Sequence, residues 1–248
     1  MTTSSALRFQ IERALEHRFP AALTPAPREF REVSATGISE VDALLDGGIP
    51  VGAISELTGP DTSGRTSLAI SFLAQRTSTE QVCAWVDASD NFDPESAAAS
   101  GVLLHKLLWV RCRNAGHDTK VRPWTCLDQA LRATDLLLQV GGFGSIVLDI
   151  GNIAPQFGRR IPLATWFRFR QSSDRTRCCL VVLGKASYAQ SSAALVLECA
   201  PSHKETAGET VLSGVSYVIR RSRERFVQFS PGVRKLPAST WSLRPQWE

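Results

Sequence analysis

Apolar residues along this chain gather in short runs of strand length, separated by segments with apolar residues at helical spacing. The clearest runs cover residues 53–58, 82–86, 145–150 and 178–183. They are largely apolar at successive positions, as expected for parallel strands that helices cover on both faces. Between the second and third runs, apolar residues at helical spacing over residues 127–138 predict one of those helices. The pattern therefore predicts an α/β fold built on a mainly parallel sheet.

The two ends of the chain depart from this central pattern. Residues 4–19 carry an apolar stripe that predicts a helix, and prolines in the next ten residues read as a linker. Toward the other end, apolar segments follow one another without helices and predict an antiparallel edge to the sheet; they are residues 195–199, 215–219 and 226–229. We therefore expect three regions, namely an N-terminal helix and linker at 1–30, a core domain at 31–230 and a C-terminal tail at 231–248.

Composition narrows the class of protein. The 248 residues contain no apolar run near the roughly 18 residues of a membrane span and no apolar signal-peptide core at the start. We therefore expect a cytoplasmic protein without a membrane partner. The six cysteines form no Cys-x-x-Cys pair, and Cys112, His117 and Cys126 lack the spacing of a common zinc site. Buried reduced thiols and no zinc are the prediction.

The positive charge of the chain is local. The net charge is only +4, yet residues 157–177 hold six arginines against one aspartate. Residues 215–235 hold five arginines and one lysine against one glutamate. Two such segments on an otherwise acidic body are typical of a polyanion-binding surface, and salt bridges or solvated faces are the alternative.

The most specific motif is a glycine-rich loop between the first predicted strand and a predicted helix at residues 66–75. In such loops backbone N–H groups surround phosphate oxygens, a lysine reaches the outer phosphates and a hydroxyl binds Mg²⁺. Arg65 replaces the lysine here, and its long planar side chain cannot take an ammonium's position without rearranging the loop. ATP and Mg²⁺ are therefore candidate cofactors, with weak or no hydrolysis expected. The predicted nucleotide-binding residues are Gly59, Asp61, Thr62, Ser63, Gly64, Arg65, Thr66 and Ser67.

Three aspartates near strand ends are candidates for chemistry beside a bound phosphate. Asp149 ends a buried strand, where a carboxylate can hold magnesium-bound water, so Asp149 and Thr66 are the predicted metal-site residues. Asp87 and Asp90 follow another strand and are the candidate catalytic residues that would activate water. Each of these two could equally be a strand-end cap.

Aromatic and basic residues alternate from Trp166 to Arg170. Aromatic faces beside guanidinium groups are used by proteins that bind single-stranded nucleic acid. The helical spacing of Trp166 and Phe169 would equally suit a packed core. The candidate nucleic-acid residues are Arg159, Arg160, Arg168, Arg170 and Lys185.

Taken together, these segments make the chain resemble the RecA recombinase family, over about residues 35–230. The loop is similar to the family's Gly-Pro-Glu-Ser-Ser-Gly-Lys-Thr, and other stretches are similar to its lead-in, its catalytic-glutamate segment and its second nucleotide motif. The resemblance implies a RecA-like P-loop NTPase core. The similar segments are residues 38–45, 47–52, 59–66, 86–88, 92–94, 128–131 and 146–149.

The chain also departs from that family at functional positions. Besides Arg65, it has Ser89 where the family places a catalytic glutamate, with Asp90 one position later. Lys185 stands where the family has a glutamine that senses the terminal phosphate. A basic strand end resembles one that reaches a neighbour's nucleotide in a family filament, which implies a trans-nucleotide or partner role and a homo-oligomer. Its residues are Arg220, Arg221 and Arg223.

A short RecA-like chain with these changes most resembles the ImuA family, accessory proteins of bacterial damage-induced mutagenesis. That resemblance implies a DNA-repair adaptor of the SOS response that acts in translesion synthesis. Its implied partners are DNA, expected to be single-stranded, ImuB-like proteins and error-prone polymerases. Two alternatives stay open: an active DNA-dependent ATPase or recombinase, and a damage-induced inhibitor of cell division without a DNA role.

Overall fold

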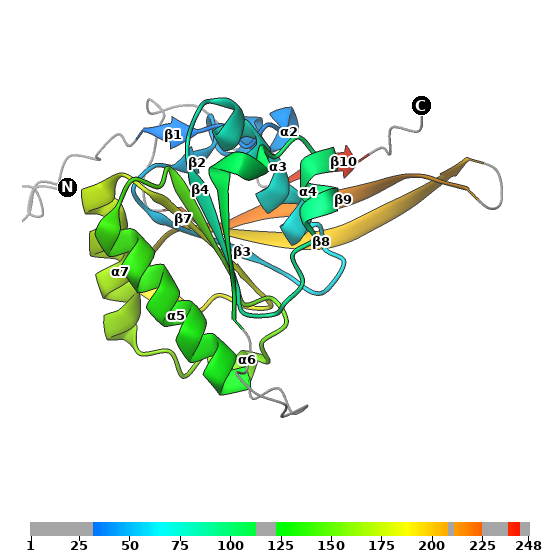
Figure 1. Cartoon of the computed structure of the whole chain (residues 1–248). Helices are drawn as coiled ribbons and strands as arrows, with labels where there is room; N and C mark the ends of the chain where they lie inside the picture. The colour runs from blue at the N-terminus through cyan, green and yellow to red at the C-terminus, as the bar shows by residue number, and fades with distance from the viewer. Residues whose placement is uncertain (1–31, 113–122, 208–210, 225–237, 244–248) are drawn as a thin grey trace, which may run out of the picture. The chain divides into compact units, whose positions relative to one another are not determined.

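The computed structural model describes residues 32–112, 123–207, 211–224 and 238–243. Its main feature is an eight-stranded sheet in the order β10-β9-β8-β3-β7-β6-β4-β5, and a small second sheet joins β1 and β2 (Figure 1). The strands are β1 (Val33–Ser34), β2 (Ile49–Pro50), β3 (Ile54–Thr58), β4 (Cys83–Asp87), β5 (Leu107–Arg111), β6 (Ser145–Asp149), β7 (Cys179–Gly184), β8 (Ala193–Ala207), β9 (Val211–Glu224) and β10 (Ala238–Leu243). The helices are α2 (Ser39–Leu44), α3 (Arg65–Ser78), α4 (Pro94–Ala99), α5 (Pro123–Val140), α6 (Pro155–Gly158) and α7 (Leu163–Thr176), with short 3₁₀ turns at Leu104–Lys106 and Gln190–Ser192.

Most of the large sheet is parallel. β3 pairs in parallel with β7 and β8, β4 with β5 and β6, and β6 with β7. β9 is antiparallel to both β8 and β10. The predicted parallel core with an antiparallel C-terminal edge is therefore confirmed. The four apolar runs of the sequence correspond to β3, β4, β6 and β7.

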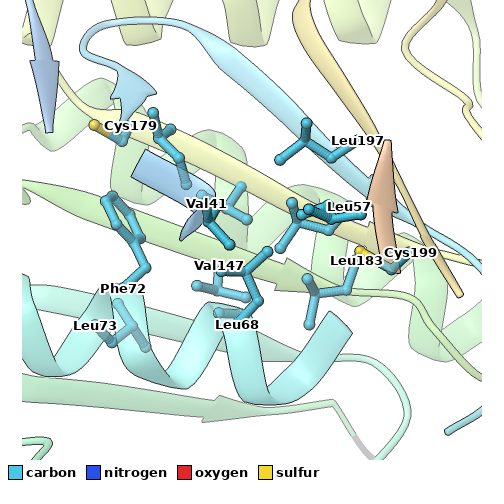
Figure 2. Packing of buried hydrophobic residues seen from close by; sticks show 14 of the residues in the cluster. Val41, Leu57, Leu68, Phe72, Leu73, Val147, Cys179, Leu183, Leu197 and Cys199 are labelled. Atoms are coloured by element: carbon cyan, nitrogen blue, oxygen red, sulfur yellow. The ribbon is translucent and has the colours of Figure 1, made fainter. Parts of the chain in front are cut away.

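Helices cover both faces of this sheet (Figure 1). On one face α3 buries Leu68, Phe72 and Leu73 completely against the strands (Figure 2). Burial of a leucine or phenylalanine of this kind stabilises the fold by about 1.5–3 kcal/mol. On the other face Trp166 and Phe169 of α7 are also fully buried, with their rings in an edge-to-face contact 5.9 Å apart. Core packing therefore explains the helical spacing of these two aromatic residues.

The last turn of α3 is tied to the start of β6. Arg76 donates hydrogen bonds from Nε to the Ser145 hydroxyl at 3.2 Å and from Nη2 to the Gly144 carbonyl at 3.2 Å. Its Nη1 donates to the Ser34 hydroxyl at 3.0 Å, which adds β1 to the same contact. Because guanidinium hydrogen bonds are directional, this one side chain fixes the end of the helix relative to two strands.

Two strands of the sheet were missed by sequence reasoning. β5 forms the edge beside β4 and is only half-buried, so it lacks the continuous apolar run of a central strand. β10 lies within residues 231–248, for which the sequence predicts a C-terminal tail. Trp241 of β10 is buried and stacks on Tyr217 of β9 at 4.8 Å, so this part of the tail contributes a strand to the core sheet.

Some sequence predictions concern residues outside the described parts of the chain. They are the helix at 4–19 with its region 1–30, and the strand at 226–229. The prediction for the cysteines is confirmed, since all six are free and buried. Of the helices that the structure describes, none has the length and apolar character needed to cross a membrane.

A candidate phosphate-binding site at the C-terminal edge of the sheet

The glycine-rich loop joins β3 to α3 and lies close to β8 and β9. Gly59 has φ +152°, and a Cβ added there would lie 2.2 Å from the Cys199 carbonyl oxygen of β8. Gly64 has φ +83°, and a Cβ there would lie 2.8 Å from the Tyr217 ring of β9. Both positions need glycine because of their backbone angles and this close approach. The local motif therefore depends on strands more than 130 residues away along the chain.

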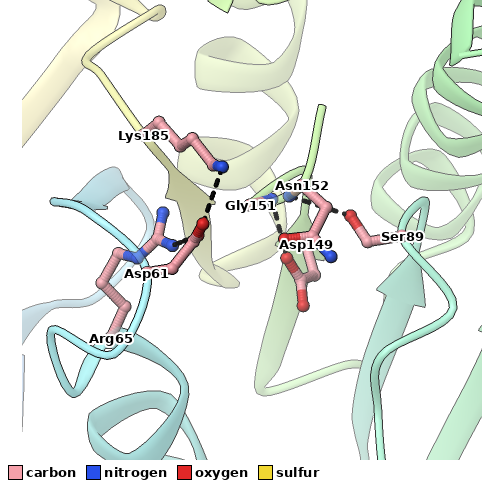
Figure 3. Close-up of polar contacts among 7 residues, drawn as sticks. All are labelled: Asp61, Arg65, Ser89, Asp149, Gly151, Asn152 and Lys185. Carbon is pink, nitrogen blue, oxygen red and sulfur yellow. Dashed lines mark hydrogen bonds and ion pairs between the residues drawn. The ribbon is translucent and has the colours of Figure 1, made fainter. Parts of the chain in front are cut away.

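Arg65 is the first residue of α3, and its side chain is 9% exposed. Its Nη2 lies 3.3 Å from Oδ1 of Asp61, in the same loop. A Cβ built on Gly151, just after β6, would lie 3.7 Å from both terminal nitrogens of Arg65. The long side chain of Arg65 therefore extends from the loop toward the end of β6 (Figure 3).

Two buried donors of this loop have no hydrogen-bond partner among the described residues. They are Nη1 of Arg65 and the hydroxyl of Ser63, whose exposed fractions as residues are 8% and 1%. A buried polar group without a partner is costly, and such groups in native proteins commonly face a ligand or an ion. A cationic and a neutral donor together suit an anion such as a phosphate group.

Asp61 connects the loop to the end of β7. Its Oδ2 accepts a hydrogen bond from the Lys185 ammonium at 2.9 Å, while Oδ1 faces Arg65 (Figure 3). The hydrogen bond from Lys185 is the largest cause that lowers the pKa of the Asp61 carboxyl. The carboxylate is therefore ionised at neutral pH. The single negative charge of Asp61 is therefore shared between Arg65 and Lys185. Asp61 and Lys185 are 124 residues apart in the sequence.

Asp149 ends β6 and is almost completely buried. Its Oδ1 accepts a hydrogen bond from the Gly151 N–H at 2.8 Å. Burial raises the pKa of its carboxyl to about 6; the Gly151 N–H and the charge of Arg65 lower it, and the charge of Asp87 raises it further. Thr66, its predicted partner in a metal site, is exposed in the first turn of α3.

The raised pKa of Asp149 gives a testable pH dependence. The folded chain holds the extra proton between about pH 4 and pH 6, so the contribution of this group to the free energy of unfolding falls as the pH rises through that interval. Asp149→Asn keeps the acceptor for Gly151 and is expected to stabilise the protein by about 2–3 kcal/mol at pH 7.5. Urea unfolding at pH 7.5 and pH 4 measures this, and the two proteins should converge at the lower pH. A difference that is the same at both pH values would contradict the assignment.

Asp87 lies at the end of β4 and organises the turn that follows. Its Oδ1 accepts hydrogen bonds from the N–H groups of Ser89 and Asn91 at 3.0 and 3.2 Å, and its Oδ2 accepts one from Phe92 at 2.9 Å. The residue is fully buried. These contacts favour the strand-end cap for Asp87 over activation of water.

Asp90 is held by an arginine from the edge strand. Arg111 of β5 approaches Oδ1 of Asp90 with Nε at 2.8 Å and Nη2 at 2.7 Å, and its guanidinium stacks on Trp109 at 4.5 Å. Nearby, the Ser89 hydroxyl accepts a hydrogen bond from the Asn152 N–H at 3.2 Å, which joins the loops after β4 and β6 (Figure 3). Both candidate catalytic carboxylates are thus engaged by the protein itself.

The candidate nucleic-acid residues lie on several elements. Arg159 and Arg160 follow α6 and are exposed, whereas Arg168 of α7 forms an ion pair with Asp135 of α5 at 2.9 Å. Arg170 of α7 is exposed, and Lys185 follows β7. The contact of Arg168 is thus a salt bridge, which was the alternative to a polyanion-binding role for this basic segment.

Among the aromatic residues of α7, only the middle one of the three is on the surface. Phe167 is 51% exposed, while its neighbours Trp166 and Phe169 are fully buried. Any contact between α7 aromatics and nucleic-acid bases therefore rests on Phe167.

The three arginines of the basic strand end have different surroundings on β9. Arg220 is exposed. Arg221 forms an ion pair at 3.4 Å with Asp46, and the two side chains are 7% and 9% exposed. Its contact with a partner's nucleotide therefore stays a prediction. Arg223 donates a hydrogen bond to the Gln190 carbonyl and lines a cavity of about 570 Å³ with loop residues Gly59 and Pro60 and with Lys185.

Sequence reasoning missed Glu56, a buried carboxylate in the middle of β3. It accepts hydrogen bonds from the Ser187 hydroxyl and from the N–H groups of Tyr188 and Ala189 at 2.6 and 2.9 Å. It therefore fixes the turn after β7 that carries Lys185. The signal was present, because a glutamate inside an otherwise buried strand needs several donors.

A three-layer α/β core with a glycine-rich loop ahead of α3 and a buried acid at the tip of β6 defines a P-loop protein of the RecA type. The chain matches the family model of the RecA N-terminal domain over residues 9–156 and belongs to this family. It is 37% identical to Protein RecA of Ruegeria pomeroyi over 119 residues, which are 48% of this chain and 31% of that protein. The match thus spans about a third of the length of that RecA. The crystal structure of the RadB recombinase has the same fold, with a TM-score of 0.55 at 16% identity, and the comparison covers 85% of this chain and 94% of RadB.

Proposed function

We propose that this protein is a RecA-like accessory protein of DNA repair that acts as an adaptor in damage-induced translesion synthesis. In this role it binds DNA and polymerase-type partners and hydrolyses ATP weakly or not at all. The likeness to the ImuA family supports ImuB-like and error-prone polymerase proteins as those partners. Membership in the RecA family supports the link to DNA repair.

The observation that carries the proposal is that both candidate catalytic carboxylates already contact other groups of the protein. Asp87 accepts three backbone hydrogen bonds, and Asp90 pairs with Arg111. Hydrolysis needs a carboxylate free to orient water beside the terminal phosphate. The protein therefore has the fold of a RecA-type domain, but its two candidate catalytic carboxylates make structural contacts within the protein.

Binding of a nucleotide without turnover is consistent with the same site. The two buried donors of the loop, on Ser63 and Arg65, would bind phosphate oxygens. Asp149 and Thr66 would hold Mg²⁺, which would screen the phosphate charge. A buried carboxyl with a raised pKa fits this role, because a cation stabilises its charged form. The described residues contain no cluster of three or more acidic, histidine or cysteine side chains that could hold a metal ion, so phosphate and water oxygens would complete the coordination.

A steady-state ATPase assay with and without single-stranded DNA tests the proposal. We expect turnover below about 0.01 s⁻¹ and no stimulation by DNA, well under the roughly 1–1,000 s⁻¹ typical of enzymes. Arg65→Ala serves as the control, because turnover that survives in this variant comes from a contaminant. Rapid DNA-stimulated hydrolysis that Arg65→Ala removes would contradict the adaptor role and favour a working ATPase.

A further inference from the structure

We propose that Asp61 is an internal competitor of the phosphate ligand, because its carboxylate contacts the two cations that a bound polyphosphate would also contact. The inference concerns the affinity and selectivity of the loop, and it rests on the proposed nucleotide binding. It makes Asp61 a residue that determines which anions the site accepts.

The geometry of the cluster supports this role. Asp61 lies 3.3 Å from Nη2 of Arg65 and 2.9 Å from the ammonium of Lys185, so its two oxygens use one cation each. Lys185 belongs to the segment after β7, and Arg65 to the start of α3. Carboxylate and phosphate oxygens use the same donors with similar geometry. A phosphate that reaches both cations must therefore displace Asp61 or share them with it.

The loop also contains donors that Asp61 does not use. Nη1 of Arg65 and the Ser63 hydroxyl are buried and have no partner within the described residues. Asp61 itself is well exposed, with 61% of its side chain accessible. An exposed carboxylate can move away at little cost, whereas the buried donors stay in place. The site is therefore built for an anion that enters from outside, with Asp61 as the group that it replaces.

Charge gives the expected direction of the effect. Asp61 cancels one of the two positive charges of Arg65 and Lys185, and it would repel a polyphosphate that carries several negative charges. Its exposure to solvent screens this repulsion, so the effect is moderate. If Asp61 served only to hold the loop in shape, its neutralisation would weaken ligand binding, and the sign of the change separates the two roles.

The test measures binding of ATP with Mg²⁺ by calorimetry at about 50 mM salt, where screening is limited. Asp61→Asn keeps the size of the side chain and is expected to bind about five- to tenfold tighter than the unchanged protein. Asp128→Asn is the matched control, since it removes the same charge from another exposed i,i+4 ion pair, with Arg132. It should stay within about twofold of the unchanged protein, as expected for a screened charge.

A second background shows whether Lys185 carries part of the competition. In Lys185→Ala, the gain from Asp61→Asn should shrink to about twofold, because one of the two contested cations is gone. Equal or weaker affinity of Asp61→Asn, with binding that still depends on Arg65, would overturn the competition and leave nucleotide binding intact. Absence of ATP binding in every variant, Asp61→Asn included, would overturn both.

Discussion

Replacement of Trp166 by alanine is expected to lower the free energy of unfolding by about 3–5 kcal/mol, the range for large aromatic residues cut back in a core. Trp166 is fully buried on the α7 side of the sheet, and its ring meets Phe169 edge to face. Loss of the ring removes a large apolar surface and leaves a cavity that the surrounding strands cannot fill without distortion. Urea unfolding followed by circular dichroism measures the change.

The neighbouring residue provides the matched control. Phe167→Ala is expected to change stability by less than about 0.5 kcal/mol, because half of its ring already faces solvent. If DNA binds this surface, Phe167→Ala should weaken single-stranded DNA binding by about fivefold or more, since base stacking on an aromatic ring contributes about 1–3 kcal/mol. Similar losses of stability for both variants would show that the helix is rotated from the described position.

Neutralisation of Asp46 is expected to lower the free energy of unfolding by a similar amount, about 3–5 kcal/mol. The side chains of Asp46 and Arg221 are 9% and 7% exposed, so Asp46→Asn removes a carboxylate charge that faces a largely buried guanidinium. The backbone does not account for a loss, because Asp46 has φ +61° and asparagine tolerates this left-handed conformation well. Asp46→Asn therefore tests the effect of the negative charge alone.

Glu32→Gln is the comparison for Asp46→Asn. Glu32 pairs with Arg177 at 2.7 Å, but both side chains are more than half exposed. Such pairs typically contribute up to about 1 kcal/mol, so this variant should unfold close to the unchanged protein. A small effect of Asp46→Asn in the same chemical unfolding experiment would contradict a stabilising ion pair at this position and would favour Arg221 as a candidate for contact with a partner.

The parts of the fold that were predictable from sequence are those with local signals. The runs at β3, β4, β6 and β7 are apolar because helices cover both faces, and this is visible without knowledge of their partners. β10 was not predictable in this way, because Trp241 is buried by Tyr217 of another strand. For β5, position at the edge of the sheet leaves a half-buried pattern that resembles an ordinary surface segment.

The same distinction holds at the site. The glycine-rich loop and Asp149 were predictable, since the motif and the strand end are continuous in sequence. The engagement of Asp61 by Lys185 and of Asp90 by Arg111 was not, because these pairs are 124 and 21 residues apart. For Asp87, a cap and a water-activating role are equally consistent with the sequence, and the three backbone donors seen in the structure favour the cap.

Both ends of α3 carry an arginine that reaches β6. Arg65 extends to Gly151 beyond the strand's last residue, and Arg76 binds Gly144 and Ser145 where it begins. Helix α3 thus has one arginine near each end of β6, and the one at its C-terminal end, Arg76, is hydrogen-bonded there. An anion bound at the first turn of α3 would therefore contact a helix whose other end is anchored to β6 through Arg76.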